Sequence, residues 1–163
     1  MAHHSLLQSV LESNIFDAKR NQLKMATIVV QTEINSTIEK AWNIISDIDN
    51  EPKFWKGTKA VKTLSVEGDI ISREITIAFR DQKCLQEIQL IPKQTIKAKF
   101  TKGILNGTKI ITLTPKENNL IILETIWDIK LSGMMNMFTA MIKNHIKSGT
   151  EQAMTSIKKE IEA

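Results

Sequence analysis

Two polar side chains interrupt the apolar face of a hairpin that the sequence predicts at residues 70–80 and 83–91. Arg73 lies on that face in the first strand, and Gln86 lies on it in the second. A buried cation is costly unless it is paired, so Arg73 must meet an acid, reach the edge of the sheet or bind a ligand. Its functional interpretation is an anchor for a carboxylate, phosphate or carbonyl; its structural one is a side chain that extends to water. Gln86 could bind the same ligand, or it could satisfy a bulge or a buried water.

His145 is the other side chain that could move a proton, because histidine is the usual acid–base group near neutral pH. It lies on the edge of the apolar stripe of a C-terminal helix, where a core or rim role is more common, and no nearby carboxylate is spaced to orient it. The single cysteine, Cys84, alternates into the buried face of its strand and is interpreted as a small apolar residue. We find no metal-ligand cluster, phosphate-binding glycine loop or Gly-x-Ser-x-Gly motif, so we predict no metal, no cofactor and no assigned catalytic residue.

The composition is that of an ordinary single domain of 163 residues with a net charge of +4. The lysines are spread along the chain, which favours a solvated surface over a nucleic-acid partner. No apolar run reaches the ~18 residues of a membrane span, and no signal-peptide pattern opens the chain. With one cysteine no internal disulfide can form, so we expect a reducing, cytoplasmic location. The sequence does not decide between a monomer and a homodimer.

Domain organisation is predicted to change at residue 25. Residues 1–24 are interpreted as an N-terminal extension or tag-like segment, partly flexible, with an adjacent His3-His4 pair that is not a metal site. The alternative is a helix from Leu6 to Phe16 that docks on the domain or on a second copy. Residues 25–163 carry a continuous pattern of strands and helices.

The first half of that pattern is a strand followed by two short helices. The strand is predicted at 26–34 and the first helix at 37–47, with Ser36 as N-cap and Glu39 completing a capping box. The second helix carries Phe54 and Trp55 and ends near Gly57. It is interpreted as capping one end of the core or covering a cavity mouth.

Six strands joined by short turns then predict an antiparallel meander. They are expected at 58–66, 70–80, 83–91, 95–102, 107–115 and 119–130. A two-residue turn at Asp81-Gln82 would place Arg73 opposite Leu90 and Ile75 opposite Ile88. Alternation is weak at 107–115, so the register of that strand stays open, and Asn106-Gly107 is interpreted as part of a turn.

The last segment, residues 133–163, is predicted to be one long helix that packs on the sheet. Its stripe is bulky and soft in the first half and small from Ile146 onward, with Gly149 allowing close packing. The first half would therefore line a space, and thioether side chains suit an adaptable apolar pocket.

The order of elements resembles the helix-grip fold of the START-like superfamily, also called SRPBCC. That superfamily includes the birch-pollen allergen family and polyketide cyclase/dehydrase-like proteins. The resemblance is carried by "TEINSTIEKAWNIISDIDNEPKFW" and "IKSGTEQAMTSIKKEIE" and extends over about residues 26–162. It implies an α+β fold in which a curved, seven-stranded antiparallel sheet wraps around the C-terminal helix, with two short helices between strands one and two. It also implies an apolar cavity between sheet and helix.

We therefore predict binding of a small hydrophobic molecule (a lipid, isoprenoid, quinone or polyketide-like compound) for transport or sequestration. Two alternatives stay open: a cyclase, dehydratase or hydrolase that uses Arg73 and His145, and a protein-interaction or co-chaperone-like module with an exposed apolar patch. The predicted ligand-binding residues are those expected to face the cavity: Phe54, Trp55, Arg73, Ile75, Ile77, Gln86, Ile88, Ala98, Phe100, Thr125, Trp127, Met134, Phe138, Met141 and His145.

Overall fold

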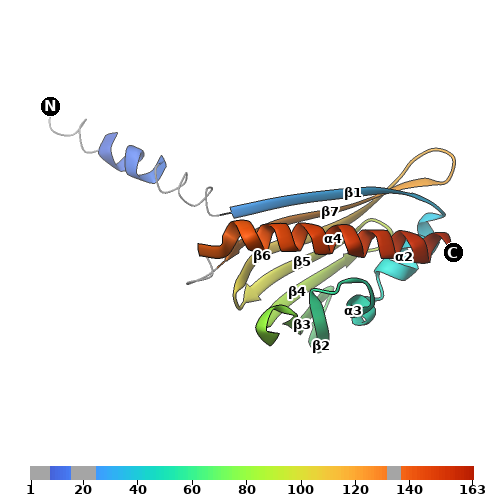
Figure 1. The fold of residues 1–163 in the computed structure, drawn as a ribbon, viewed down its shortest axis with the longest axis horizontal. Coiled ribbons are helices and arrows are strands. Elements are labelled where there is room, and N and C mark those ends of the chain that lie inside the picture. The colour runs from blue at the N-terminus through green and yellow to red at the C-terminus, as the bar shows by residue number, and fades with distance from the viewer. Residues whose placement is uncertain (1–7, 16–24, 132–136) are drawn as a thin grey trace.

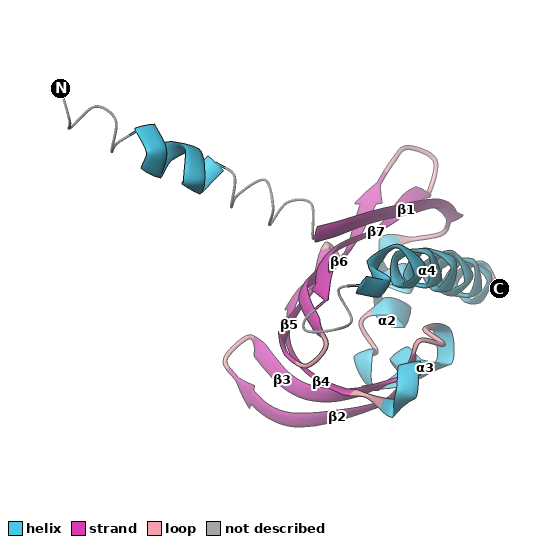
Figure 2. Cartoon of the chain, turned by 60° about the vertical axis from the view of Figure 1, so that its left-hand side comes forward, coloured by secondary structure: helices cyan, strands magenta, loops and turns pink. Residues whose placement is uncertain are grey.

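The computed structural model describes residues 8–15, 25–131 and 137–163. Residues 8–15 are helical and stand apart from the sheet, with Val10, Leu11 and Ile15 exposed (Figures 1 and 2). The remaining elements, in chain order, are β1 (Met25–Asn35), α2 (Ile38–Ile45), η1 (Ile48–Asn50), α3 (Glu51–Phe54), β2 (Thr58–Glu67), β3 (Ile70–Ile77), η2 (Phe79–Asp81), β4 (Lys83–Ile91), β5 (Thr95–Lys102), β6 (Leu105–Pro115), β7 (Leu120–Leu131) and α4 (Thr139–Glu162).

The seven strands form one antiparallel sheet in the order β1-β7-β6-β5-β4-β3-β2. Strands β2 to β7 are neighbours in sequence order, as short turns require, and β1 closes the far side by pairing with β7. Figure 2 shows the sheet curving around α4, with α2 and α3 on the same side. The predicted α+β architecture, with two short α-helices between the first two strands, is confirmed.

The long helix packs its small aliphatic half on the sheet. Ala153 and Ile157, which the stripe predicted, are buried there, and so are Met154 and Ile161. The helix begins at Thr139, later than the sequence suggested, and residues 137–138 form a 3-10 turn. An exposed Met137 provides no packing to hold a further helical turn. Residues 132–136 lie outside the described part of the chain, so of the predicted helical residues before Thr139 the structure tests only 137 and 138.

The predicted register of the β3–β4 hairpin is wrong by four residues. Residues 79–81 form a 3-10 turn in which Arg80 and Asp81 have positive φ, so the connection is longer than two residues. Arg73 consequently pairs with Gln86, and Ile75 pairs with Cys84. The error is an even number, so every side chain keeps its predicted face.

Two local features of the sequence were also misassigned. The N-cap of α2 is Thr37, whose hydroxyl accepts from the backbone N–H of Lys40, so Ser36 and Glu39 do not form the predicted capping box. Gly107 lies inside β6 rather than in a turn, and its φ of +118° suits only glycine. It is paired with Ile129 on β7. In the same register Lys109 pairs with Trp127, and its side chain is buried.

We expect Gly107→Ala to destabilise the fold by about 2 kcal/mol, because a Cβ there would collide with the carbonyl oxygen of Asp128 and force a strained φ. Urea unfolding followed by circular dichroism measures the change. Gly68→Ala is the matched control: that turn glycine also has a positive φ, but a Cβ there would meet open space. Equal losses for the two variants would contradict the clash.

Candidate ligand-binding cavity

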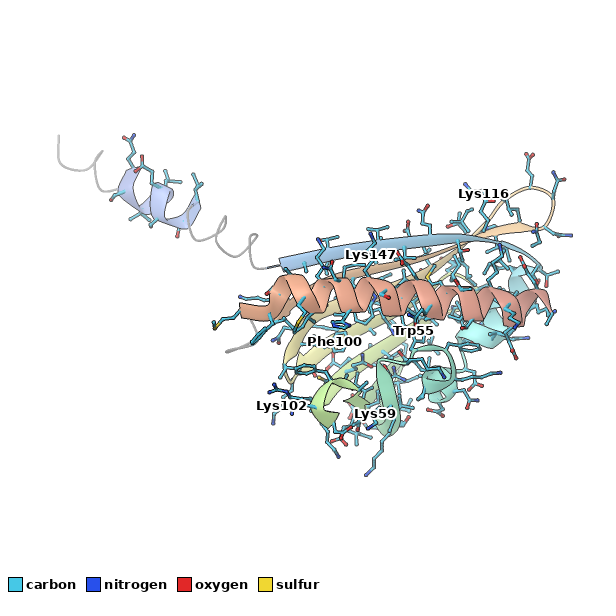
Figure 3. The ribbon with its side chains drawn as sticks, viewed as in Figure 1. Trp55, Lys59, Phe100, Lys102, Lys116 and Lys147 are labelled. Carbon is cyan, nitrogen blue, oxygen red and sulfur yellow. The ribbon has the colours of Figure 1, made fainter. Side chains whose placement is uncertain are left out.

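A cavity of about 430 Å³ lies between the first half of α4 and the curved sheet. This volume is within the range of small-molecule sites. Its walls come from α3, η2, α4 and strands β2 to β7. Most of the lining side chains are apolar: Trp55, Ile75, Ile77, Phe79, Phe100, Ile104, Leu105, Trp127, Leu131, Met141, Ile142 and Ile146. Figure 3 shows Trp55 and Phe100 in the region between α4 and the strands.

Three aromatic rings form a connected wall. Trp127 stacks on Phe100 with ring centroids 6.0 Å apart and meets Trp55 edge-to-face at 6.2 Å. The indole N–H of Trp127 donates to the Thr150 hydroxyl at 3.0 Å, and that hydroxyl donates to the carbonyl of Ile146 at 2.6 Å. A buried indole needs such a partner. The bond therefore ties the ring on β7 to α4 and fixes the wall.

Arg73, Glu51 and Lys109 form a buried charged cluster, which we call the ionic cluster, and two of its members, Glu51 and Lys109, line the cavity. One carboxylate oxygen of Glu51 accepts from the Lys109 ammonium at 2.5 Å, and the other accepts from the Arg73 guanidinium. Arg73 also donates to the Gln86 side-chain oxygen at 2.9 Å and to the carbonyl of Ile48 at 3.0 Å. Among the described residues, every buried side-chain N or O atom has a hydrogen-bond partner.

Three separate elements build the ionic cluster. Glu51 opens the four-residue helix α3, directly after η1, and Pro52 fits the first turn of that helix. Arg73 lies on β3, and Lys109 lies on β6 opposite Trp127. The curvature of the sheet points both cations toward α3, where a single carboxylate receives them.

The charges of the ionic cluster shift the pKa of two members. Burial alone would raise the pKa of the Glu51 carboxyl, but Lys109 and Arg73, by charge and hydrogen bonds, outweigh it and hold that pKa below its ordinary value. Burial lowers the pKa of the Lys109 ammonium, and Glu51 offsets this only in part while Arg73 adds repulsion. Lys109 also lies 4.0 Å from the ring centroid of Trp55 and 5.1 Å from that of Trp127, positions that favour a cation.

Both sequence interpretations of Arg73 need correction. The side chain is 1% exposed, so it does not extend to water. It does not line the large cavity either, and its donors are engaged by Glu51, Gln86 and Ile48. Its acid partner was missed because it comes from α3 and not from the same face of the sheet.

The structure divides the other predicted site residues into groups. Eight line the large cavity: Trp55, Ile75, Ile77, Gln86, Phe100, Trp127, Met141 and His145. Three others, Phe54, Ile88 and Ala98, line a separate small void of about 30 Å³, which Arg73 also lines. Thr125 lines neither, because its hydroxyl donates to the Met154 sulfur at 3.0 Å. Phe138 is 47% exposed and lines neither, and Met134 lies outside the described residues.

Sequence reasoning missed Glu51, Lys109 and the space at Gly149. Lys109 lies on the same face of β6 as Leu105, Ile111 and Leu113, which are buried. The adjacent Ile110 and Ile111 obscured that face in the sequence. Glu51 looked like an ordinary first-turn acid. Gly149 does not mediate close packing: a Cβ there would have no heavy atom within 4 Å, and the residue lines the cavity.

Other chemistry finds little support in the described parts of the chain. Cys84 is buried on β4, and burial raises the pKa of its thiol, which opposes a nucleophilic role. Residues 8–15, 25–131 and 137–163 contain no group of three or more His, Cys, Asp or Glu side chains that could hold a metal. No described helix is long and apolar enough to cross a membrane.

Comparison with known proteins identifies the fold. No protein-family model matches the chain, and no curated protein matches its sequence. Among solved structures, the chain is similar to the Zhui aromatase/cyclase from a Streptomyces species, with a TM-score of 0.70 and 10% identity over 85% of this chain and 94% of that one. It is similar to StfQ, a di-domain aromatase/cyclase of the steffimycin biosynthetic pathway, with a TM-score of 0.72 and 11% identity over 96% of this chain and 58% of that one.

A START superfamily protein from Mycobacterium smegmatis also matches, with a TM-score of 0.58 and 13% identity over 77% of this chain and 94% of that one. Identities this low establish the fold alone. The chain has the START-like, or SRPBCC, helix-grip fold, as the resemblance implied.

Proposed function

We propose that the protein binds a small hydrophobic molecule in the cavity under α4, for transport or sequestration. The observation that carries the proposal is the cavity itself, about 430 Å³ in volume with three aromatic rings and many aliphatic side chains on its walls. Filling an apolar space of this size with a ligand removes apolar surface from water, which is the main favourable term in such binding.

The two alternatives receive less support. The enzymatic hypothesis requires Arg73 and His145 to meet on one substrate atom, but Arg73 does not line the cavity that His145 lines. The interaction-module hypothesis requires an exposed apolar patch in place of a pocket, and a pocket is present. The likeness to aromatase/cyclases concerns the fold, so an activity on a bound polyketide-like compound stays an alternative prediction.

A neutral fluorescent probe tests the proposal. We expect phenylnaphthylamine to bind with an increase in fluorescence and to raise Tm, because a ligand that binds only the folded state stabilises it. Gly149→Phe should weaken binding at least about tenfold, or about 1.4 kcal/mol, by filling the open space beside the helix. The matched control is Ser148→Phe, which adds the same ring one residue away at an exposed position of α4.

The fold should survive Gly149→Phe, since replacing a helical glycine favours the helix. Equal probe affinity in wild type, Gly149→Phe and Ser148→Phe would place the probe outside the cavity. Absence of binding to the wild-type protein by this probe, together with no small molecule retained in native mass spectrometry, would overturn the proposal. A cytoplasmic location, the monomer or homodimer state, the absence of a nucleic-acid partner and the division at residue 25 stay predictions.

A further inference from the structure

The ionic cluster carries one more positive charge than negative charge. Its two cations share one carboxylate, and each oxygen of Glu51 is already used by one of them. Among the described residues, no second acid forms an ion pair with either cation. All three side chains are at most 9% exposed, so water screens this excess charge poorly.

Lys109 is the cation that faces the cavity. Lys109 and Glu51 line both the cavity and the smaller void, whereas Arg73 lines only the smaller void. An ammonium has three N–H donors, and one points to the Glu51 carboxylate at 2.5 Å. The rings of Trp55 and Trp127 also lie close to it, with centroids 4.0 Å and 5.1 Å away, and they attract the charge but are weak acceptors. The cavity is therefore mostly apolar, with a buried cation on its wall at Lys109.

We propose that the ligand is an organic acid: an apolar or aromatic body with an anionic group that pairs with Lys109 on the cavity wall. This inference rests on the proposed function and narrows it to acids, away from neutral quinones, alcohols and sterol-like lipids. An anion at Lys109 would neutralise the ionic cluster. It would also accept hydrogen bonds from the ammonium N–H groups that do not donate to Glu51. Gln86, on the cavity wall, offers its side-chain amide as a neighbouring donor because its oxygen already accepts from Arg73.

The chemistry of the anion has two natural forms. A carboxylate or sulfonate would bind as a fixed charge, and an acidic phenol or enol would bind as its ionised form. Both present oxygen acceptors to an ammonium, so the shared requirement is a negatively charged oxygen at the end of an apolar body. The aromatic wall formed by Trp55, Phe100 and Trp127 would contact that body.

A pair of matched fluorescent probes tests the charge preference. Phenylnaphthylamine is neutral, and anilinonaphthalene sulfonate has the same ring system with one sulfonate added. We expect Lys109→Met to raise the Kd of the sulfonate about 10- to 100-fold, as a lost hydrogen bond to a charged group would, while the Kd of the neutral probe changes less than about threefold. Lys147→Met is the control: it removes an exposed lysine of α4 that does not line the cavity, and it should leave both Kd values unchanged.

Lys109→Met should fold, because it leaves Arg73 and Glu51 as a balanced pair. A second measurement does not need the variant: dodecanoate should displace the neutral probe from wild type at least about tenfold better than dodecanol, which has the same chain and no charge. Binding of the neutral probe without any preference for the acid, in both measurements, would overturn this inference and leave the proposed function standing. Failure of both probes to bind wild type, together with no small molecule retained in native mass spectrometry, would instead contradict the proposed function itself.

Discussion

Glu51→Ala is expected to lower the free energy of unfolding by about 3–5 kcal/mol, the usual loss when one partner of a buried ion pair is removed. Glu51 is the only described acid in the ionic cluster, so its loss leaves Arg73 and Lys109 buried close together with no counter-charge. Urea unfolding followed by circular dichroism measures the difference. Glu51→Gln should also be strongly destabilised, although its amide oxygen can still accept one hydrogen bond.

The controls separate charge from packing. Lys109→Met should cost much less than Glu51→Ala, because it removes the excess cation and keeps Arg73 paired with Glu51. The double variant Glu51→Gln/Lys109→Met should be more stable than Glu51→Gln alone, since one of the two unbalanced cations is gone. A Glu51→Ala loss below about 1 kcal/mol, typical of a solvated pair, would contradict the buried charge balance.

The lowered pKa of Glu51 also predicts a pH dependence. In the unfolded chain a glutamate titrates near pH 4.3, and in the fold the Glu51 carboxyl holds its proton less tightly. Its contribution to stability is therefore complete above that unfolded pKa and is lost as the pH falls through the folded value. Wild type should lose stability more steeply than Glu51→Gln between about pH 5 and pH 3.

Trp127→Ala is expected to cost about 3–5 kcal/mol, as for other large core side chains. The indole is 9% exposed, stacks on Phe100, meets Trp55 and donates to Thr150 on α4. Its removal would enlarge the cavity and release the contact between β7 and the helix. Trp127→Phe should cost less, because it keeps an aromatic ring while losing the N–H donor.

Urea unfolding and titration of phenylnaphthylamine test the two roles of Trp127 together. Trp127→Ala should weaken binding of the probe, since the ring that joins Phe100 and Trp55 in the aromatic wall is gone. Trp42→Ala is the control: that tryptophan packs on the core from α2 and does not line the cavity, so probe affinity should hold even if stability falls. A Trp127→Ala protein with unchanged stability and unchanged probe affinity would contradict this account.

The sequence by itself determined the architecture. Period-two alternation placed the strands to within a few residues, and short turns left antiparallel neighbours as the natural arrangement. The stripe on the C-terminal helix indicated which half packs tightly. The faces of β3 and β4 were correct even with a misplaced register, because alternation identifies a face and does not measure turn length.

Only the tertiary structure decided what the polar residues do. Arg73 looked unpaired because its acid, Glu51, lies 22 positions earlier in the chain and reaches it across the concave face. Lys109 was hidden because adjacent isoleucines blur the alternation of β6, and its direction depends on pairing with β7. Gly149 was taken for a close contact, whereas it leaves open space. Periodicity is a local property, but charge pairing and empty volume arise between distant segments, so they appear only when the sheet curves around the helix.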